Sequence, residues 1–187
     1  ESASHMLSDK EEVLASKLSM VGSSSWSDLQ SQSTANLMIK VKGLKDKVSL
    51  STVRNMAYSN STIERKNAYL AELDAYKSIQ DSVAMALNNI KREVNIMMPL
   101  RGYSNALEKT LKQSNISLET LNAMIDAIKD ESPKFREYFK LKAKALGYKK
   151  GLPFYEIFAP MGSLTKTYTV EEAKELVLDV YKSFSEP

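Results

Sequence analysis

The residue types that most often carry enzyme chemistry are scarce in this sequence. Its 187 residues include one histidine, His5, and no cysteine. Nucleophile systems such as Ser-His-Asp use a histidine as the base, and the zinc motif H-E-x-x-H needs two histidines one helical turn apart. Ser4-His5-Met6 is typical of a cloning remnant or a frayed terminus. The sequence therefore predicts neither catalytic residues nor metal ligands in this chain.

Carboxylates remain as candidates for acid–base chemistry. Adjacent acidic pairs occur at Glu11-Glu12, Asp130-Glu131 and Glu171-Glu172. A carboxylate-only hydrolase needs two acids facing each other across a cleft, whereas these pairs lie at expected helix ends, where capping and solvation account for them. Gly22 precedes three serines, but the lysine of a phosphate-binding loop is missing, so the segment is predicted as a junction between two helices.

Composition narrows the class of protein. With 26 basic and 23 acidic residues the charge is nearly balanced, so we expect no nucleic-acid or membrane partner. No apolar run approaches the roughly 18 residues of a membrane span, and nothing resembles a signal peptide. The absence of cysteine is compatible with a reducing cytosol.

One stretch, from Ser61 to Met98, dominates the secondary-structure pattern. It contains neither Gly nor Pro, and Ser61 with Glu64 has the spacing of a capping box. Its apolar residues recur three or four positions apart, which indicates one helical face. The stretch is predicted as a single long helix of roughly 57 Å around which other helices pack.

The remaining signals predict shorter elements. Alternation from Leu37 to Leu50 predicts a β-hairpin. Because an isolated hairpin is marginal in water, it must lie against helices or against a part of the protein outside this chain. Further helix starts are expected at Ser8, Ser117, Ser132-Pro133 and Thr169. The predicted fold is mainly α: a multi-helix bundle built around one long helix (about 61–98), with one small β-hairpin (about 37–50). Residues 1–60 hold the N-terminal helices and hairpin, and 61–187 a helical lobe, in one compact fragment.

Several stretches, in this order along the chain, resemble oligoendopeptidase F, of the thimet-oligopeptidase-like zinc metallopeptidases. The matching region of that family precedes its catalytic domain. The stretches are Leu7-Ser8 with its acidic helix, Val21-Gly22-Ser23-Ser24-Ser25-Trp26-Ser27, the hairpin, Glu64-Arg65-Lys66-Asn67-Ala68-Tyr69, Arg101-Gly102-Tyr103-Ser104-Asn105-Ala106-Leu107-Glu108, the turn from Gln113 to Ser117, Tyr155-Glu156-Ile157-Phe158-Ala159-Pro160, and Tyr168-Thr169-Val170-Glu171-Glu172-Ala173-Lys174-Glu175-Leu176. Pro153-Phe154 departs from the family's more usual pair before the tyrosine.

The resemblance implies a cytosolic enzyme that cuts short oligopeptides in a channel between two helical lobes. In that family a zinc ion, held by H-E-x-x-H and a downstream Glu, activates the attacking water. Those motifs would follow Pro187, so zinc is expected in the full-length enzyme and not in this fragment, which should be inactive alone. Its expected partners are the oligopeptide substrate and the missing catalytic lobe, and self-association through an exposed lobe interface is also anticipated.

Four residues are candidates for contacts with the substrate channel: Arg101, Gly102, Tyr103 and Tyr155. The simpler interpretation makes Gly102 a turn glycine and the two tyrosines packing residues. A second function class also remains open, a non-enzymatic helical adaptor that holds a partner helix in a groove beside the long helix. A complete adaptor would expose no large apolar patch, whereas a severed lobe would expose one.

Overall fold

The computed structural model describes residues 3–162 and 167–184. Helices dominate this part of the chain, and its one sheet has two antiparallel strands, so the predicted mainly α fold with one hairpin is confirmed. The elements are, in chain order, η1 (Ala3–His5), α1 (Asp9–Val21), α2 (Ser23–Ala35), β1 (Met38–Ile39), β2 (Val48–Ser49), α3 (Leu50–Asn55), η2 (Met56–Tyr58), α4 (Thr62–Tyr76), α5 (Gln80–Leu100), α6 (Ala106–Gln113), α7 (Leu118–Ala145), η3 (Phe154–Glu156) and α8 (Val170–Phe184).

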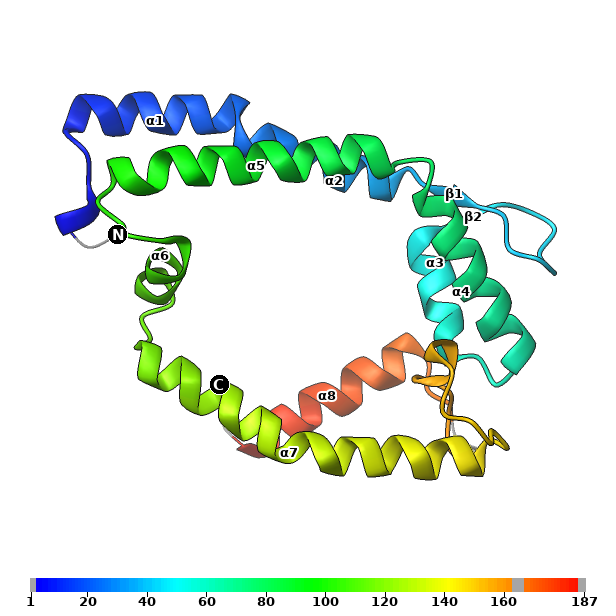
Figure 1. Cartoon of the computed structure of the whole chain (residues 1–187). Coiled ribbons are helices and arrows are strands. Elements are labelled where there is room, and N and C mark those ends of the chain that lie inside the picture. Colours follow the sequence, from blue (N-terminus) through cyan, green and yellow to red (C-terminus); the bar gives the residue numbers. More distant parts are fainter. Residues whose placement is uncertain (1–2, 163–166, 185–187) are drawn as a thin grey trace.

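The helices lie around an open frame (Figure 1). One long side is formed by α5 together with α1 and α2, a short side by α3 and α4, and the opposite long side by α7, which α6 joins to α5. The most extensive helix packing is that of α2 on α5. The frame therefore consists of one well-packed side and one side that stands largely alone.

The prediction of a single helix over 61–98 is wrong, because the structure has two helices there, separated by a turn. α4 ends at Tyr76 and α5 begins at Gln80, and the turn between them is closed by short-range bonds, such as that from Ile79 N–H to Tyr76 O at 3.1 Å. The Ser78 hydroxyl donates to Ala75 O (2.7 Å), which competes with continued helical bonding. Tyr76 and Ile79 both pack on the hairpin core, so the bend lets both bury apolar surface there.

The predicted helix start at Ser132-Pro133 is also wrong, because α7 continues through Pro133. The Ser132 hydroxyl donates to Ile128 O (2.7 Å) within the helix, so it does not cap a new one. Pro133 removes only one intrahelical donor, and strong helix formers flank it on both sides. Figure 1 shows α7 bending part-way along its length.

The hairpin forms a small core with the helices beneath it. Its strands are only two residues long, with Met38 opposite Ser49 and Ile39 opposite Val48. Of the two predicted supports, helices of this chain are the one observed, since the hairpin packs on α3 and α4. The buried residues of this cluster are Leu37, Ile39, Val41, Leu50, Val53 and Ala68.

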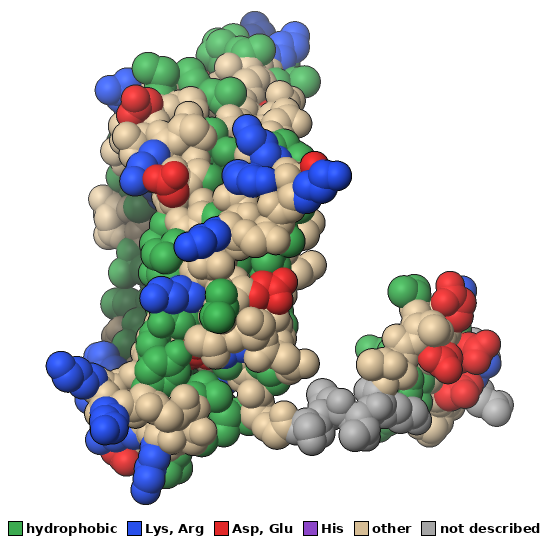
Figure 2. Space-filling model, turned by 90° about the vertical axis from the view of Figure 1, so that its right-hand side faces the viewer, with side chains coloured by type: hydrophobic (Ala, Val, Ile, Leu, Met, Phe, Trp, Pro, Cys, Tyr) green, Lys and Arg blue, Asp and Glu red, His purple; other side chains and the backbone are tan. Residues whose placement is uncertain are grey.

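Two helices leave their apolar faces uncovered. α7 buries only Lys142 and Ala143, near its C-terminal end, and no described residue of α8 is buried. Figure 2 shows α8 standing apart from the main body. We call the exposed apolar side chains of both helices the α7–α8 apolar surface. It comprises Leu118, Met124, Ile125, Ile128, Phe135, Tyr138, Phe139, Leu141, Val170, Leu176, Val177, Leu178, Val180, Tyr181 and Phe184.

None of the described helices is both long enough and apolar enough to cross a bilayer.

Candidate functional site

Three of the four predicted site residues form the turn between α5 and α6. Gly102 has φ +72°, a left-handed conformation that favours glycine, and Tyr103 N–H donates to Met98 O (3.0 Å) to close the turn. The Arg101 guanidinium donates twice to Glu12 of α1, from Nη1 to Oε1 at 2.7 Å and from Nη2 to Oε2 at 2.8 Å. This two-point ion pair joins the turn to the N-terminal helix.

The N-terminal segment packs on the same turn. His5 stacks on the Tyr103 ring, with centroids 3.9 Å apart, and the ring of Tyr103 is only 4% exposed. His5 Nδ1 lies 2.8 Å from Arg101 O, and because a carbonyl only accepts, Nδ1 carries the proton. The prediction of a frayed terminus is therefore wrong for His5, which packs on the turn.

Tyr155 lies away from that turn. It follows α7 in the segment around η3, which packs on α4 at the opposite end of the frame from the end of α5 (Figure 1). There it lines a cleft of about 410 Å³, which we call the aromatic cleft. The cleft is lined by Val53, Arg54, Asn55, Ala57, Tyr58, Arg65, Ala68, Tyr69, Glu72, Phe154, Tyr155 and Phe158. The structure thus brings Arg101, Gly102 and Tyr103 together but not Tyr155.

A buried ion pair supports the η3 segment. Arg65 of α4 is 3% exposed and Glu156 is fully buried. Arg65 donates to Glu156 Oε2 through Nε (3.0 Å) and Nη2, and its Nη1 donates to Ser59 O (2.5 Å). Tyr148 O–H donates to Glu156 Oε1 (2.9 Å), and burial together with this bond raises the pKa of Tyr148. Each oxygen of the buried carboxylate therefore has a donor.

Lys142 reinforces this junction from α7. Its side chain is buried, and its ammonium donates to Ile157 O (2.7 Å). Sequence reasoning missed both the ion pair and this bond. One sequence feature could have indicated the ion pair: Glu156 is a single acid inside an aromatic and apolar segment. An acid in such a segment is seldom buried unless it is paired.

A second polar junction, centred on Glu93 of α5, fixes the corner between α1 and α2. Glu93 accepts from Ser23 N–H (2.6 Å), Ser23 Oγ (2.7 Å) and Ser19 Oγ (2.9 Å). The carboxylate thus caps the start of α2, where a negative charge suits the helix dipole. The predicted helix junction at Gly22 is confirmed, and the serines beside it bind a side chain of the chain itself.

Glu93 makes stability depend on pH. Burial favours its protonated form, but the hydrogen bonds from Ser23 and Ser19 outweigh burial and lower its pKa below the ordinary 4.5. Because the folded-state pKa is depressed, the stabilisation is complete above pH 4.5 and is lost as the pH falls through the folded-state pKa. We expect the free energy of unfolding, measured by urea titration, to fall less steeply below pH 4.5 in Glu93→Gln than in the unmodified chain. Equal slopes would contradict this role.

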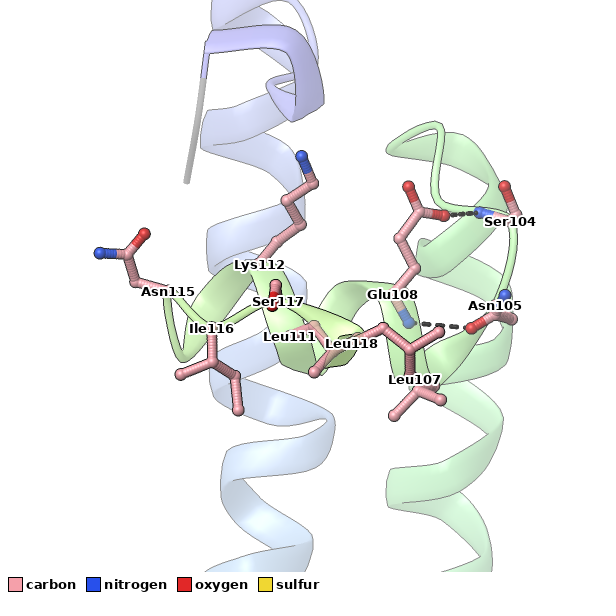
Figure 3. A pocket seen from close by; sticks show the side chains of 10 residues that line it. All are labelled: Ser104, Asn105, Leu107, Glu108, Leu111, Lys112, Asn115, Ile116, Ser117 and Leu118. Atoms are coloured by element: carbon pink, nitrogen blue, oxygen red, sulfur yellow. Dashed lines mark hydrogen bonds between the residues drawn. The ribbon is translucent and has the colours of Figure 1, made fainter. Parts of the chain in front are cut away.

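One hollow near the Arg101 turn belongs to α6 and its flanks. It measures about 640 Å³, and the residues that line it all come from 104–118 (Figure 3). Asn105 and Glu108 cap α6 reciprocally: Ser104 N–H donates to Glu108 Oε2 and Glu108 N–H to Asn105 Oδ1, both at 2.8 Å. These polar groups are thus used in holding α6. Across the described ranges, no three His, Cys, Asp or Glu side chains are placed to hold a metal ion.

Proteins similar to this chain were found among solved structures. No protein-family model matches the sequence, and no curated protein matches it. Among solved structures, a "putative peptidase" from Chlamydophila abortus is similar, with TM-score 0.72 and 26% identity over 95% of this chain and 30% of that chain. Oligoendopeptidase-F from Enterococcus faecium is similar in fold, with TM-score 0.74 and 22% identity over 96% of this chain and 34% of that chain. This chain spans about a third of the length of both, and its structural resemblance to oligoendopeptidase F is confirmed.

Proposed function

We propose that this chain is the non-catalytic helical lobe of a zinc-dependent oligoendopeptidase and lines part of the channel in which short peptides are cut. The observation that carries the proposal is the similarity to the Chlamydophila abortus protein along nearly the whole chain. The described residues do not fit a zinc ion, since no suitable ligand cluster lies among them. The metal and the catalytic residues would be supplied by a part of the enzyme outside this chain, in the cytoplasm.

The α7–α8 apolar surface supports the same proposal. Isolated helices are marginal in water, and exposed apolar helix faces are normally covered by another protein part. A catalytic lobe seated on α7 and α8 would cover these side chains and complete the channel. In the 187-residue chain the same surface would drive self-association.

Within that channel the Arg101–Tyr103 turn and Tyr155 are the proposed contact positions, and Tyr103, at 4% exposure, would act by holding the turn. The turn is held by Glu12 and His5, and Tyr155 by the η3 segment above Glu156. Both are fixed by neighbours, which suits residues that position a peptide.

The experiment starts from the gene. The reading frame is sequenced past the codon for Pro187, and its product is assayed with quenched-fluorescent peptides of graded length, with and without a zinc chelator. We expect an H-E-x-x-H motif on a downstream helix, hydrolysis that the chelator abolishes, and a changed length preference or kcat/KM in Tyr103→Phe and Tyr155→Phe. Tyr168→Phe is the matched control, because this tyrosine is exposed and lies outside both the α7–α8 apolar surface and the proposed contact positions. Hydrolysis that resists the chelator would contradict the zinc mechanism. Unchanged kinetics in both variants would contradict the proposed role of the two tyrosines in the channel.

The exposed α7–α8 apolar surface counts against the second candidate, a non-enzymatic adaptor that holds a partner helix in a groove beside the long helix. A stop codon directly after Pro187, with a monodisperse monomeric product, would favour the adaptor over the peptidase lobe.

A further inference from the structure

We propose that the aromatic cleft binds a large, uncharged side chain of a peptide, at a site separate from the Arg101 turn. The choice of a peptide as ligand rests on the proposed function. The remaining argument rests on the rings, the charges and the support beneath the cleft.

Aromatic rings from three separate segments converge on this cleft. Tyr58 of η2 lies against Phe158, with ring centroids 5.1 Å apart, and Tyr69 of α4 lies 5.5 Å from Phe154 and 6.1 Å from Tyr155. Tyr58, Phe154 and Phe158 are 62%, 66% and 51% exposed. Clustered exposed rings are the usual anchors of binding sites, because they offer a large apolar area at little cost in side-chain entropy.

The rings are carried on a rigid support. Glu156 is buried between Tyr155 and Phe158 in sequence, and its pairing with Arg65 ties their segment to α4, which also carries Tyr69. Fixing the walls before the ligand arrives reduces the entropy lost on binding. The cleft is therefore preformed before a ligand binds.

The cations beside the cleft are already paired, which favours an uncharged ligand. Arg54 donates through Nε to Glu72 (2.9 Å) and through Nη2 to the Tyr76 hydroxyl (2.6 Å), and Arg65 is neutralised by Glu156. With both cations paired, a charged group entering the cleft would lose its water without gaining an opposite charge. An uncharged apolar or aromatic side chain has no such cost.

Polar groups at the same cleft suit a peptide backbone. The Asn55 amide makes no side-chain hydrogen bond within the described ranges, and it offers both a donor and an acceptor. The volume, about 410 Å³, falls within the roughly 300–1,000 Å³ of ligand pockets. These features match a short peptide whose large side chain enters the cleft while its backbone lies near Asn55.

The test uses the 187-residue chain and measures binding without hydrolysis. The probes are acetyl-Gly-Phe-Gly-amide, acetyl-Gly-Gly-Gly-amide and acetyl-Gly-Lys-Gly-amide, titrated by NMR. We expect the Phe peptide to bind tightest of the three. Phe154→Ala and Phe158→Ala should each weaken its binding about threefold to tenfold, the loss expected for one aromatic contact.

Met85→Ala on α5 is the control, because its side chain is 59% exposed and lies outside both the cleft and the α7–α8 apolar surface. It should bind like the unmodified chain, and circular dichroism checks that all variants keep their helices. Equal binding of the three probes, or binding that survives both cleft variants, would overturn the site. Since hydrolysis plays no part, this site can fail while the chelator-sensitive activity of the longer product stands, and the reverse also holds.

Discussion

Glu156→Ala is expected to lower the free energy of unfolding by about 3–5 kcal/mol, the usual cost of removing one partner from a buried ion pair. Arg65 would keep its charge at 3% exposure, where water cannot replace the lost carboxylate. Tyr148 would also lose the acceptor for its hydroxyl. The effect follows mainly from the stranded charge, since the intact pair itself adds little net stability.

Urea unfolding followed by circular dichroism measures this change. Asp74→Ala is the control, because it breaks the exposed Lys77–Asp74 pair, in which the side chains are 73% and 77% exposed. Exposed pairs contribute only about 0–1 kcal/mol. If Glu156→Ala and Asp74→Ala cost the same, the buried pair does not have the role given to it here.

Gly22→Ala should destabilise the chain by about 1–3 kcal/mol, as overpacking does in well-packed interiors. A Cβ at Gly22 would overlap Glu93 Oε2 and would lie 2.9 Å from Leu18 O, which is backbone and cannot move aside easily. Glu93 cannot retreat without losing its bonds to Ser19 and Ser23. The corner between α1 and α2 would then separate from α5.

A double-mutant cycle identifies the cause. In a Glu93→Ala background the main clash is gone, so Gly22→Ala should cost clearly less than in the unmodified chain. Equal costs in the two backgrounds, measured by urea unfolding, would show that Glu93 does not set the requirement for glycine.

Local features of the fold could be predicted because their causes lie within a few residues. The capping boxes at Ser8 and Thr169 and the cap at Ser117 are present, as is the hairpin. At Ser61 only half of the predicted box forms, because the Glu64 carboxylate accepts from Ser59 instead. The hydroxyl of Ser59, two residues before the N-cap Ser61, therefore replaces the Ser61 backbone N–H as the donor to Glu64.

The incorrect predictions concern features that are set by packing between segments far apart in the sequence. The apolar spacing runs unbroken from Leu70 to Met97, but the chain turns after Tyr76 because Tyr76 and Ile79 pack on the hairpin core. Arg65 and Glu156 are 91 positions apart, so no periodicity could pair them. The resemblance selected Arg101 and Tyr155 together, yet only the fold shows that they lie at opposite ends of the frame.

The most direct test of the central claim, that a further protein part covers the α7–α8 apolar surface, is whether that surface is uncovered in the 187-residue chain and covered in the longer product. Binding of a hydrophobic dye and sedimentation measure both. We predict that the 187-residue chain binds the dye and self-associates, that Val177→Glu reduces both, and that the longer product binds little dye. A monomeric 187-residue chain without dye binding would contradict the claim.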